Sequence, residues 1–131
     1  WATSQDSTIR DKRLSTGRHR LERGVVEFRL DAGATATLSG PAEIKLTDSP
    51  RLHLDRGQVT VVVHSETHEF VVQTPHAEIV DRGTEFAAVV DESSTLVHVF
   101  EGSVEAVLPS GDTLQILPET TFRISVDEAE D

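Results

Sequence analysis

The fold is decided by residues 24–46, which read GVVEFRLDAGATATLSGPAEIKL. Within this stretch Val26, Phe28 and Leu30 alternate with charged residues, and a second alternating run extends from residue 34 to residue 38. Alternation with a period of two turns one set of side chains to a core and the other to solvent, as in a half-buried β-strand. The Asp-Ala-Gly and Ser-Gly-Pro segments that follow the two runs predict turns.

Similar runs continue along the rest of the chain, and none of it shows convincing helical periodicity. They cover residues 42–46, 51–54, 58–64, 69–74, 77–80, 84–90, 95–100, 103–108, 113–117 and 121–126. About a dozen short strands predict an all-β sandwich, barrel or β-helix-like stack. Of these we expect a single domain in a two-layer stacked sheet (a sandwich or a β-helix-like stack) with little or no helix. We expect a lead-in segment or linker over residues 1–16, the β-domain over 17–126, and the start of an acidic linker over 127–131.

A charged residue followed by glycine recurs just ahead of several predicted strands. The spacing between successive glycines of this kind falls from 33 to 26 to 19 residues, which argues against a strict repeat. The recurrence still fits stacked strand–turn–strand units whose corners require a residue without a Cβ atom. The four glycines are Gly24, Gly57, Gly83 and Gly102.

Composition excludes several classes of protein. The chain has 131 residues, 23 acidic against 12 basic, a net charge of −11 and no cysteine or methionine. The absence of cysteine rules out disulfides, zinc ribbons, iron–sulfur clusters and thiol nucleophiles. The acidic balance argues against nucleic-acid binding, and no apolar run is long enough to span a bilayer. A chain that begins with Trp1 and has no methionine is interpreted as a piece of a longer protein.

The charge is unevenly distributed along the chain. Residues 1–29 hold seven basic and four acidic residues, a net +3, whereas residues 84–131 hold one basic and eleven acidic residues, a net −10. Seven basic residues among four acidic ones are most simply a solvated arm. Any anionic partner is expected to meet these first thirty residues.

Candidate catalytic and metal-binding residues are few. His64 and His68 are four residues apart, and His98 lies in a predicted strand, yet the His-x-His element of cupins is missing. We therefore expect the histidines, His76 among them, to be scattered on the surface, and a cupin-like metal-dependent protein is only a remote alternative. No Gly-x-Ser-x-Gly elbow or other nucleophile–base pair is present. The sequence predicts no catalytic residue, no metal site and no cofactor.

Four segments of the chain, taken in order, form a sequence pattern that is far more specific than these scattered residues. They are residues 51–59 (RLHLDRGQV), 70–77 (FVVQTPHA), 83–86 (GTEF) and 97–105 (VHVFEGSVE). In this order they resemble the FecR domain family, and residues 40–43 (GPAE) with 80–86 (VDRGTEF) are similar to its planctomycete-type members. The signature residues, which we expect to be structural, are Gly57, Thr74, Pro75, Gly83, Thr84, Phe86, Glu101 and Gly102.

The resemblance implies a non-enzymatic extracytoplasmic sensing or interaction domain of a FecR-like transmembrane regulator of a sigma factor. It implies a periplasmic location, a protein partner in the cell envelope, and a membrane anchor upstream of Trp1. Planctomycete-type members are often joined to a lectin-like domain. A carbohydrate- or envelope-binding β-domain with a glycan ligand is therefore the alternative.

Overall fold

The structure, a computed structural model, describes residues 2–4, 7–12, 16–30, 34–47, 51–64, 70–81, 85–125 and 129–130. These residues form fourteen strands and no helix. No helix in the described ranges could therefore cross a membrane. The strands are β1 (Ala2–Ser4), β2 (Ser7–Lys12), β3 (Gly17–Leu21), β4 (Gly24–Leu30), β5 (Ala34–Leu46), β6 (Arg51–Val63), β7 (Phe70–Gln73), β8 (Glu78–Asp81), β9 (Glu85–Val90), β10 (Ser94–Glu101), β11 (Val104–Val107), β12 (Thr113–Ile116), β13 (Thr121–Ser125) and β14 (Ala129–Glu130).

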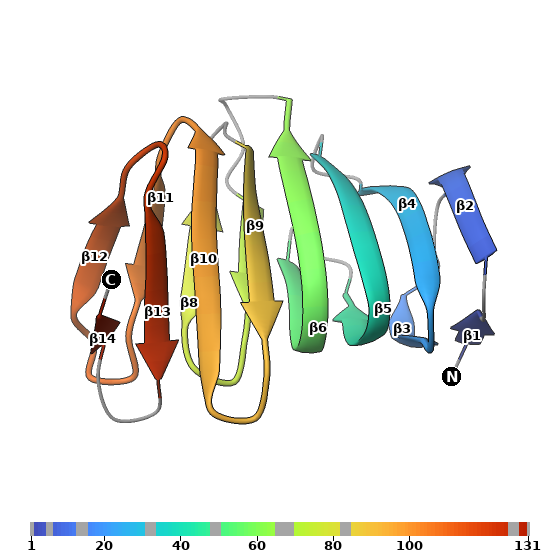
Figure 1. The fold of residues 1–131 in the computed structure, drawn as a ribbon, viewed down its shortest axis with the longest axis horizontal. Helices are drawn as coiled ribbons and strands as arrows, with labels where there is room; N and C mark the ends of the chain where they lie inside the picture. The colour runs from blue at the N-terminus through green and yellow to red at the C-terminus, as the bar shows by residue number, and fades with distance from the viewer. Residues whose placement is uncertain are drawn as a thin grey trace.

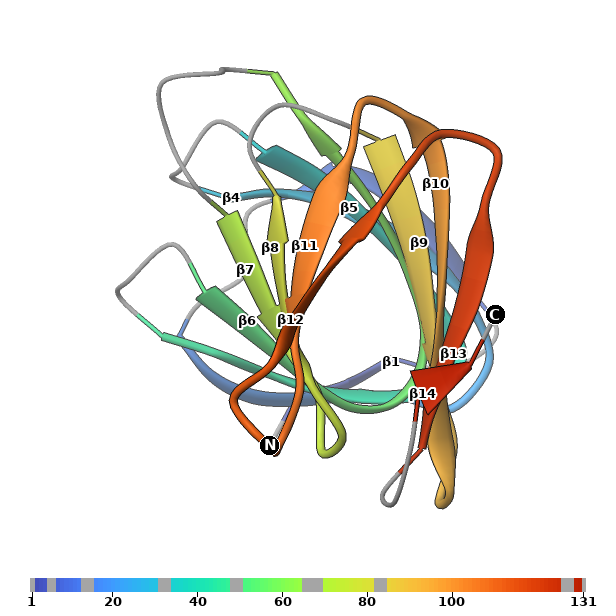
Figure 2. The ribbon, with the colours of Figure 1, turned by 90° about the vertical axis from the view of Figure 1, so that its left-hand side faces the viewer.

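All of these strands join one sheet (Figure 1). Its main path runs β12-β11-β8-β7-β6-β9-β10-β13-β14. The first four strands lie off this path and are connected to β6 through β5, which pairs with β3, β4 and β6. We call β7, β8, β11 and β12 the first arm of the sheet, and β9, β10, β13 and β14 the second arm. The arms face each other across the interior and leave the sheet nearly closed (Figure 2).

The predicted all-β class without helix is confirmed for the described residues, but the predicted two-layer stack is wrong, because the strands form one continuous sheet. The reason is that β5 and β6 are each 13 residues long: β5 continues through the predicted Ser-Gly-Pro turn, and β6 joins two runs that the sequence predicted as separate strands. The first part of β6 pairs with β7 and its last part with β9, so hydrogen bonding passes unbroken from one arm to the other. The sheet is closer to an incompletely closed barrel than to a sandwich.

Both long strands bend at a corner where the alternation of buried and exposed residues breaks. In β5 it breaks at residues 39–41 and resumes at Ala42; in β6 it breaks at residues 55–58 and resumes at Val59. The β6 corner holds Gly57 with a φ of 109°, a backbone conformation that costs other residues steric strain. A break of this kind lets one strand present inward-facing side chains to both arms.

The corners of neighbouring strands are stacked in close contact. A Cβ atom on Gly40 would lie 2.8 Å from the backbone of Arg23, and one on Gly57 would lie 2.4 Å from the Ala42 Cβ and 2.7 Å from the Pro41 carbonyl oxygen. Neither position has room for a side chain. The expectation that corners need a residue without a Cβ atom is therefore confirmed at Gly57, and Gly40 is a second such corner.

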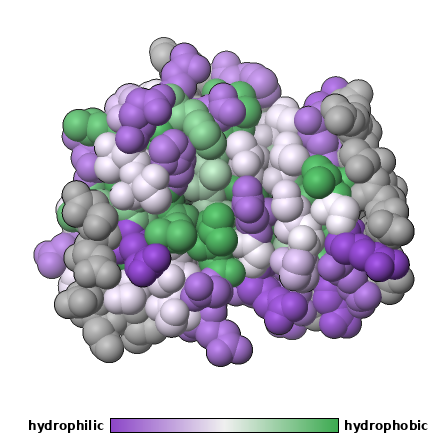
Figure 3. All heavy atoms as spheres, viewed as in Figure 1, coloured by the Kyte–Doolittle hydropathy of each residue, from purple (hydrophilic) through white to green (hydrophobic). Residues whose placement is uncertain are grey.

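The core lies inside the folded sheet and draws on both arms. Its largest fully buried side chains include Phe28, Phe70 and Phe86, one each from β4, β7 and β9. On the solvent-facing side of the second arm, apolar residues gather over β9 and β10 (Figure 3). There Val89 lies directly opposite Leu96.

The chain ends also contribute backbone to the sheet. β1 and β2 pair in parallel with β3 and β4, and β14 pairs with β13. The predicted boundaries of the β-domain at residues 17 and 126 stay predictions.

Replacing Gly57 by alanine should destabilise the fold strongly. The new methyl group would overlap Ala42 and would also strain a backbone with positive φ, so we expect a loss of about 2–4 kcal/mol in the free energy of unfolding. The matched control is Gly111→Ala, because Gly111 has a φ of 94° but nothing within 4 Å of its position for a Cβ. Urea denaturation should show a loss near 1 kcal/mol for the control; equal losses for the two variants would contradict the stacked corners.

Candidate functional site

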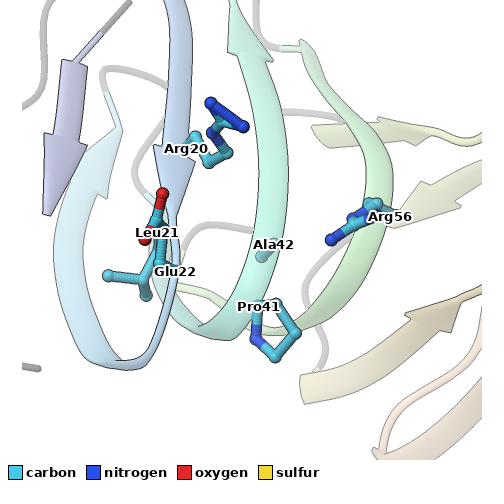
Figure 4. Close-up of a pocket in the computed structure, with 6 residues that line it drawn as sticks. All are labelled: Arg20, Leu21, Glu22, Pro41, Ala42 and Arg56. Atoms are coloured by element: carbon cyan, nitrogen blue, oxygen red, sulfur yellow. The ribbon is translucent and has the colours of Figure 1, made fainter. Parts of the chain in front are cut away.

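A shallow groove runs along the stacked corners. One part is lined by Arg20, Leu21, Glu22, Pro41, Ala42 and Arg56 (Figure 4). A second part, about 390 Å³ in volume, is lined by Pro41, Asp55, Arg56, Gly57, Pro75, Val90, Asp91 and Glu92. Because Pro41 and Arg56 belong to both parts, we treat them as one surface and call it the corner groove.

Charged side chains of opposite sign alternate across the first part of the corner groove. Arg20 on β3 is directly opposite Glu43 on β5, and Glu43 in turn is directly opposite Arg56 on β6. The Arg56 Nε lies 3.7 Å from the Glu43 carboxylate. The guanidinium groups of Arg20 and Arg56 reach toward β5 from its two sides (Figure 4). Such a row suits a ligand that carries charge of both signs.

A second row, next along the same strands, is basic. Arg18 is directly opposite Lys45, which is directly opposite His53. Burial lowers the pKa of His53, and the nearby charges of Lys45 and Arg51 lower it further, whereas Asp55 raises it. Three basic side chains, Arg18, Lys45 and Arg51, therefore lie near His53 in a chain whose net charge is −11.

Beneath the corner groove a buried hydrogen-bond network links the two arms. The Thr95 hydroxyl on β10 donates to the Thr74 Oγ1 after β7 at 2.9 Å, and the His76 Nδ1 lies 2.9 Å from the Thr95 Oγ1. Backbone N–H groups of His76 and Ala77 donate to the Thr74 Oγ1, each at 3.1 Å. The His76 Nε2 lies 3.4 Å from the Glu92 carbonyl oxygen. The network fixes the β7–β8 turn against the β9–β10 turn.

The β9–β10 turn has its own anchor in Asp91. Its Oδ1 accepts hydrogen bonds from the backbone N–H of Ser93 and of Ser94, both at 2.8 Å, and from the Ser93 hydroxyl at 3.1 Å. These bonds favour the ionised carboxylate and lower the pKa of Asp91, with a smaller contribution from the charge of His76. A negative charge is thereby held at one end of the corner groove.

The predicted signature residues occupy several different places. Gly57 and Pro75 line the corner groove, and Thr74 is in the buried network. Phe86 is fully buried in the core, while Glu101 and Gly102 lie exposed where β10 ends. Gly83 and Thr84 lie outside the described residues.

The expectation that the histidines lie on the surface is wrong for His76, which is 3 % exposed, and for His19, which is 8 % exposed. Burial is tolerated at His76 because both ring nitrogens face a polar atom. In the described part of the chain no three His, Asp or Glu side chains gather where they could hold a metal ion. His64 instead contacts Thr35, and His98 contacts Thr121; His68 lies outside the described residues.

Sequence reasoning missed most of the residues that line the corner groove. Arg20 and Arg56 come from strands more than thirty residues apart, and only the register of β5 between them makes them neighbours. The Asp-Glu-Ser-Ser run at residues 91–94 was a recognisable turn signal. Its position beside Pro75 could not be read from spacing.

Fold and site together define a class of protein: an all-β domain with a charged surface groove and a polar network joining its two arms. Residues 22–105 match the family described as FecR protein, and the chain belongs to this family. No curated protein is significantly similar in sequence.

Two solved structures share the fold. Both are described as a "putative anti-sigma factor" from Parabacteroides distasonis ATCC 8503, with TM-scores of 0.74 and 0.76 and sequence identities of 17 % and 18 %. They cover 86 % and 88 % of this chain, whereas this chain spans only 57 % and 58 % of theirs.

Thr95→Val should weaken the link between the arms. Valine keeps the shape of threonine but leaves His76 and Thr74 without a hydroxyl partner, so the free energy of unfolding should fall by about 1–3 kcal/mol. Thr60→Val is the control, because Thr60 is on the solvent-facing side of β6 and its replacement should change stability by less than about 0.5 kcal/mol. Denaturation midpoints measure both variants, and a Thr95→Val loss no larger than that of the control would refute the link.

Asp91 should make a pH-dependent contribution to stability. Its pKa is lower in the folded chain than in the unfolded chain, so its contribution is fully present above the ordinary aspartate pKa and is lost as the pH falls through the lowered value. Asp91→Asn should therefore be less stable than the wild type at pH 7. The gap should close as the pH drops below about 4. Denaturation midpoints of both proteins across this range provide the measurement, and a gap that does not change with pH would contradict the assignment.

Proposed function

We propose that this chain is the extracytoplasmic sensing and interaction domain of a FecR-like transmembrane regulator, and that it controls a sigma factor through a protein partner without catalysing a reaction. Membership of the FecR family supports the proposal, because the family consists generally of non-enzymatic regulators. The likeness in fold to structures described as a "putative anti-sigma factor" agrees with it. The periplasmic location and the membrane anchor upstream of Trp1 belong to the same proposal.

The observation that carries the interaction role is the alternation of charge along the corner groove. Arg20 and Glu22 line the first part, Asp55, Asp91 and Glu92 line the second, and Arg56 lies between them in both. A polypeptide segment that carries both basic and acidic residues would complement these side chains. Pairs of opposite charge would fix the register of the bound segment, and pairs of like charge would disfavour wrong partners. None of the lining residues is aromatic, whereas small-molecule pockets are commonly lined by aromatic side chains.

The planctomycete-type branch of the family is a finer proposal. It rests on the segments at residues 40–43 and 80–86. Gly40 and Pro41 of the first segment form the β5 corner, so the motif marks the place where the corner groove is built.

Reversing the charge at Arg56 should alter signalling by the full-length protein in its native cell. We expect deletion of residues 17–126 and Arg56→Glu to change the same group of transcripts, those of one alternative sigma factor, by several-fold under envelope stress. Arg56 is exposed and its ion pair with Glu43 is long, so the loss of this pair and the new repulsion from Glu43 should together cost only about 1 kcal/mol of stability.

The control for this experiment is Arg123→Glu, an exposed arginine in β13 that does not line the corner groove. RNA sequencing of the four strains gives the readout. Unchanged transcripts after deletion of the domain would refute the sensing role, and an equal effect of Arg123→Glu would refute the corner groove as its site.

A further inference from the structure

The free edge of the first arm is unusual for this chain because it carries no charge. Among the described strands β12 pairs with β11 alone, so its other edge is open. Its sequence, with the residue that follows it, is TLQIL. Natural sheets usually protect such an edge with charges, proline or a bulge, and 27 % of the residues of this chain are charged.

The other outer strands differ from β12 in length or charge. β1 and β14 have three and two residues, and β2 contains Arg10, Asp11 and Lys12 in its sequence. β12 is therefore the longest uncharged edge among the described strands.

Apolar side chains of the core reach this open end of the sheet. Leu108, Leu114 and Phe122 are only partly buried, although they pack against the core. Leu117, just after β12, is 54 % exposed. A strand added to β12 would cover part of this apolar surface and would continue the core by one strand.

The backbone groups that face the open edge can be identified. The Leu108 N–H donates to the Asp112 carbonyl oxygen at 2.8 Å, so residues 108 and 112 form a hydrogen-bonded pair in the β11–β12 hairpin. Hydrogen-bonded and non-hydrogen-bonded pairs alternate along an antiparallel ladder. Leu114 and Ile116 therefore direct their backbone groups to β11, whereas Thr113, Gln115 and Leu117 direct theirs to the open edge.

We propose that β12 pairs antiparallel with β12 of a second copy of this chain, about a two-fold axis at Gln115. In this register Gln115 is opposite its own copy, Thr113 is opposite Leu117, and Leu114 is opposite Ile116. The backbone groups at the open edge then face one another, and the inward-facing side chains stay on the core side of the sheet. The proposal goes beyond the signalling role and does not depend on it.

The charges beside the edge permit this pairing despite the net charge of −11. Asp112 is opposite Pro118 of the second copy, and Glu119 is opposite Gly111, so no two charges of like sign face each other across the new pair. Gln115 donates to the Ser103 hydroxyl of its own chain at 3.5 Å, which leaves its side-chain oxygen for the partner. A two-fold contact of this kind is self-complementary and closes as a dimer.

The contact between two strands is small, so the dimer should be weak. We expect a dissociation constant of about 0.1–1 mM, because interfaces below the standard size bind weakly. Sedimentation equilibrium of the purified chain over this concentration range should show reversible dimers.

Charge substitutions at Gln115 test the register itself. Gln115→Lys and Gln115→Glu each place like charges opposite each other, so each variant alone should associate at least tenfold more weakly than the wild type. An equimolar mixture of the two places lysine opposite glutamate and should recover dimer formation. Gln58→Lys is the control, because Gln58 is exposed on β6, an inner strand, and should leave association unchanged.

Three outcomes would overturn the proposal. One is a wild-type chain that remains monomeric at about 1 mM. Another is a dimer that Gln115→Lys leaves intact, because it would form elsewhere. The third is a mixture of the two charge variants that associates no better than each variant alone. Melting curves of all variants show whether each one is still folded, so that a loss of dimer formation can be distinguished from a loss of folding.

Discussion

The close contact between Gly57 and Ala42 is the constraint on which the rest of the structure depends. The backbone of Gly57 packs against the side chain of Ala42 so closely that one more carbon atom on Gly57 would not fit. Because β5 and β6 pair on both sides of their corners, one sheet supplies both arms and the core between them. Without the corner, the strand that pairs with β7 and the strand that pairs with β9 would have to be separate elements joined by a loop.

The corner also explains why Thr74, His76 and Thr95 meet at one end of the structure. Bends in β5 and β6 bring the β7–β8 and β9–β10 turns to the same place, where Thr74, His76 and Thr95 meet. Buried polar atoms in such a position require partners, and here each side chain supplies one for another. The corner groove lies over this network, so a ligand that moved the groove would act on the contact between the two arms.

Much of the fold could be predicted from the sequence. The period-two runs located β4 to β13 to within a few residues, because alternation directly reflects burial on one face. No such run was found at β1, β2, β3 or β14. The sequence could not show that the runs at residues 34–38 and 42–46 form one strand, since Ser-Gly-Pro is equally suited to a turn and to a bend. Arg23, Gly40 and Gly57 are each 17 residues apart (40 − 23 and 57 − 40), a spacing that becomes meaningful only once the corners are known to stack.

The site was less predictable than the fold, and for a physical reason. The burial of His76 depends on Thr95, 19 residues away on the opposite arm. Likewise, the corner groove is built from cross-strand neighbours whose register no local pattern encodes. The sequence signals at this place were the signature residues Gly57 and Pro75, the segment at residues 40–43 and the turn-forming run at residues 91–94.

Nuclear Overhauser spectroscopy of the isotopically labelled chain would test the stacked corner most directly. The structure requires strong cross-peaks between the α-protons of Gly57 and the methyl protons of Ala42, because a carbon atom added to Gly57 would overlap that methyl group. It also requires cross-peaks between the His76 ring and the Thr95 side chain. A well-dispersed spectrum that lacked both would contradict the account, because β5 and β6 would then not carry the sheet from one arm to the other.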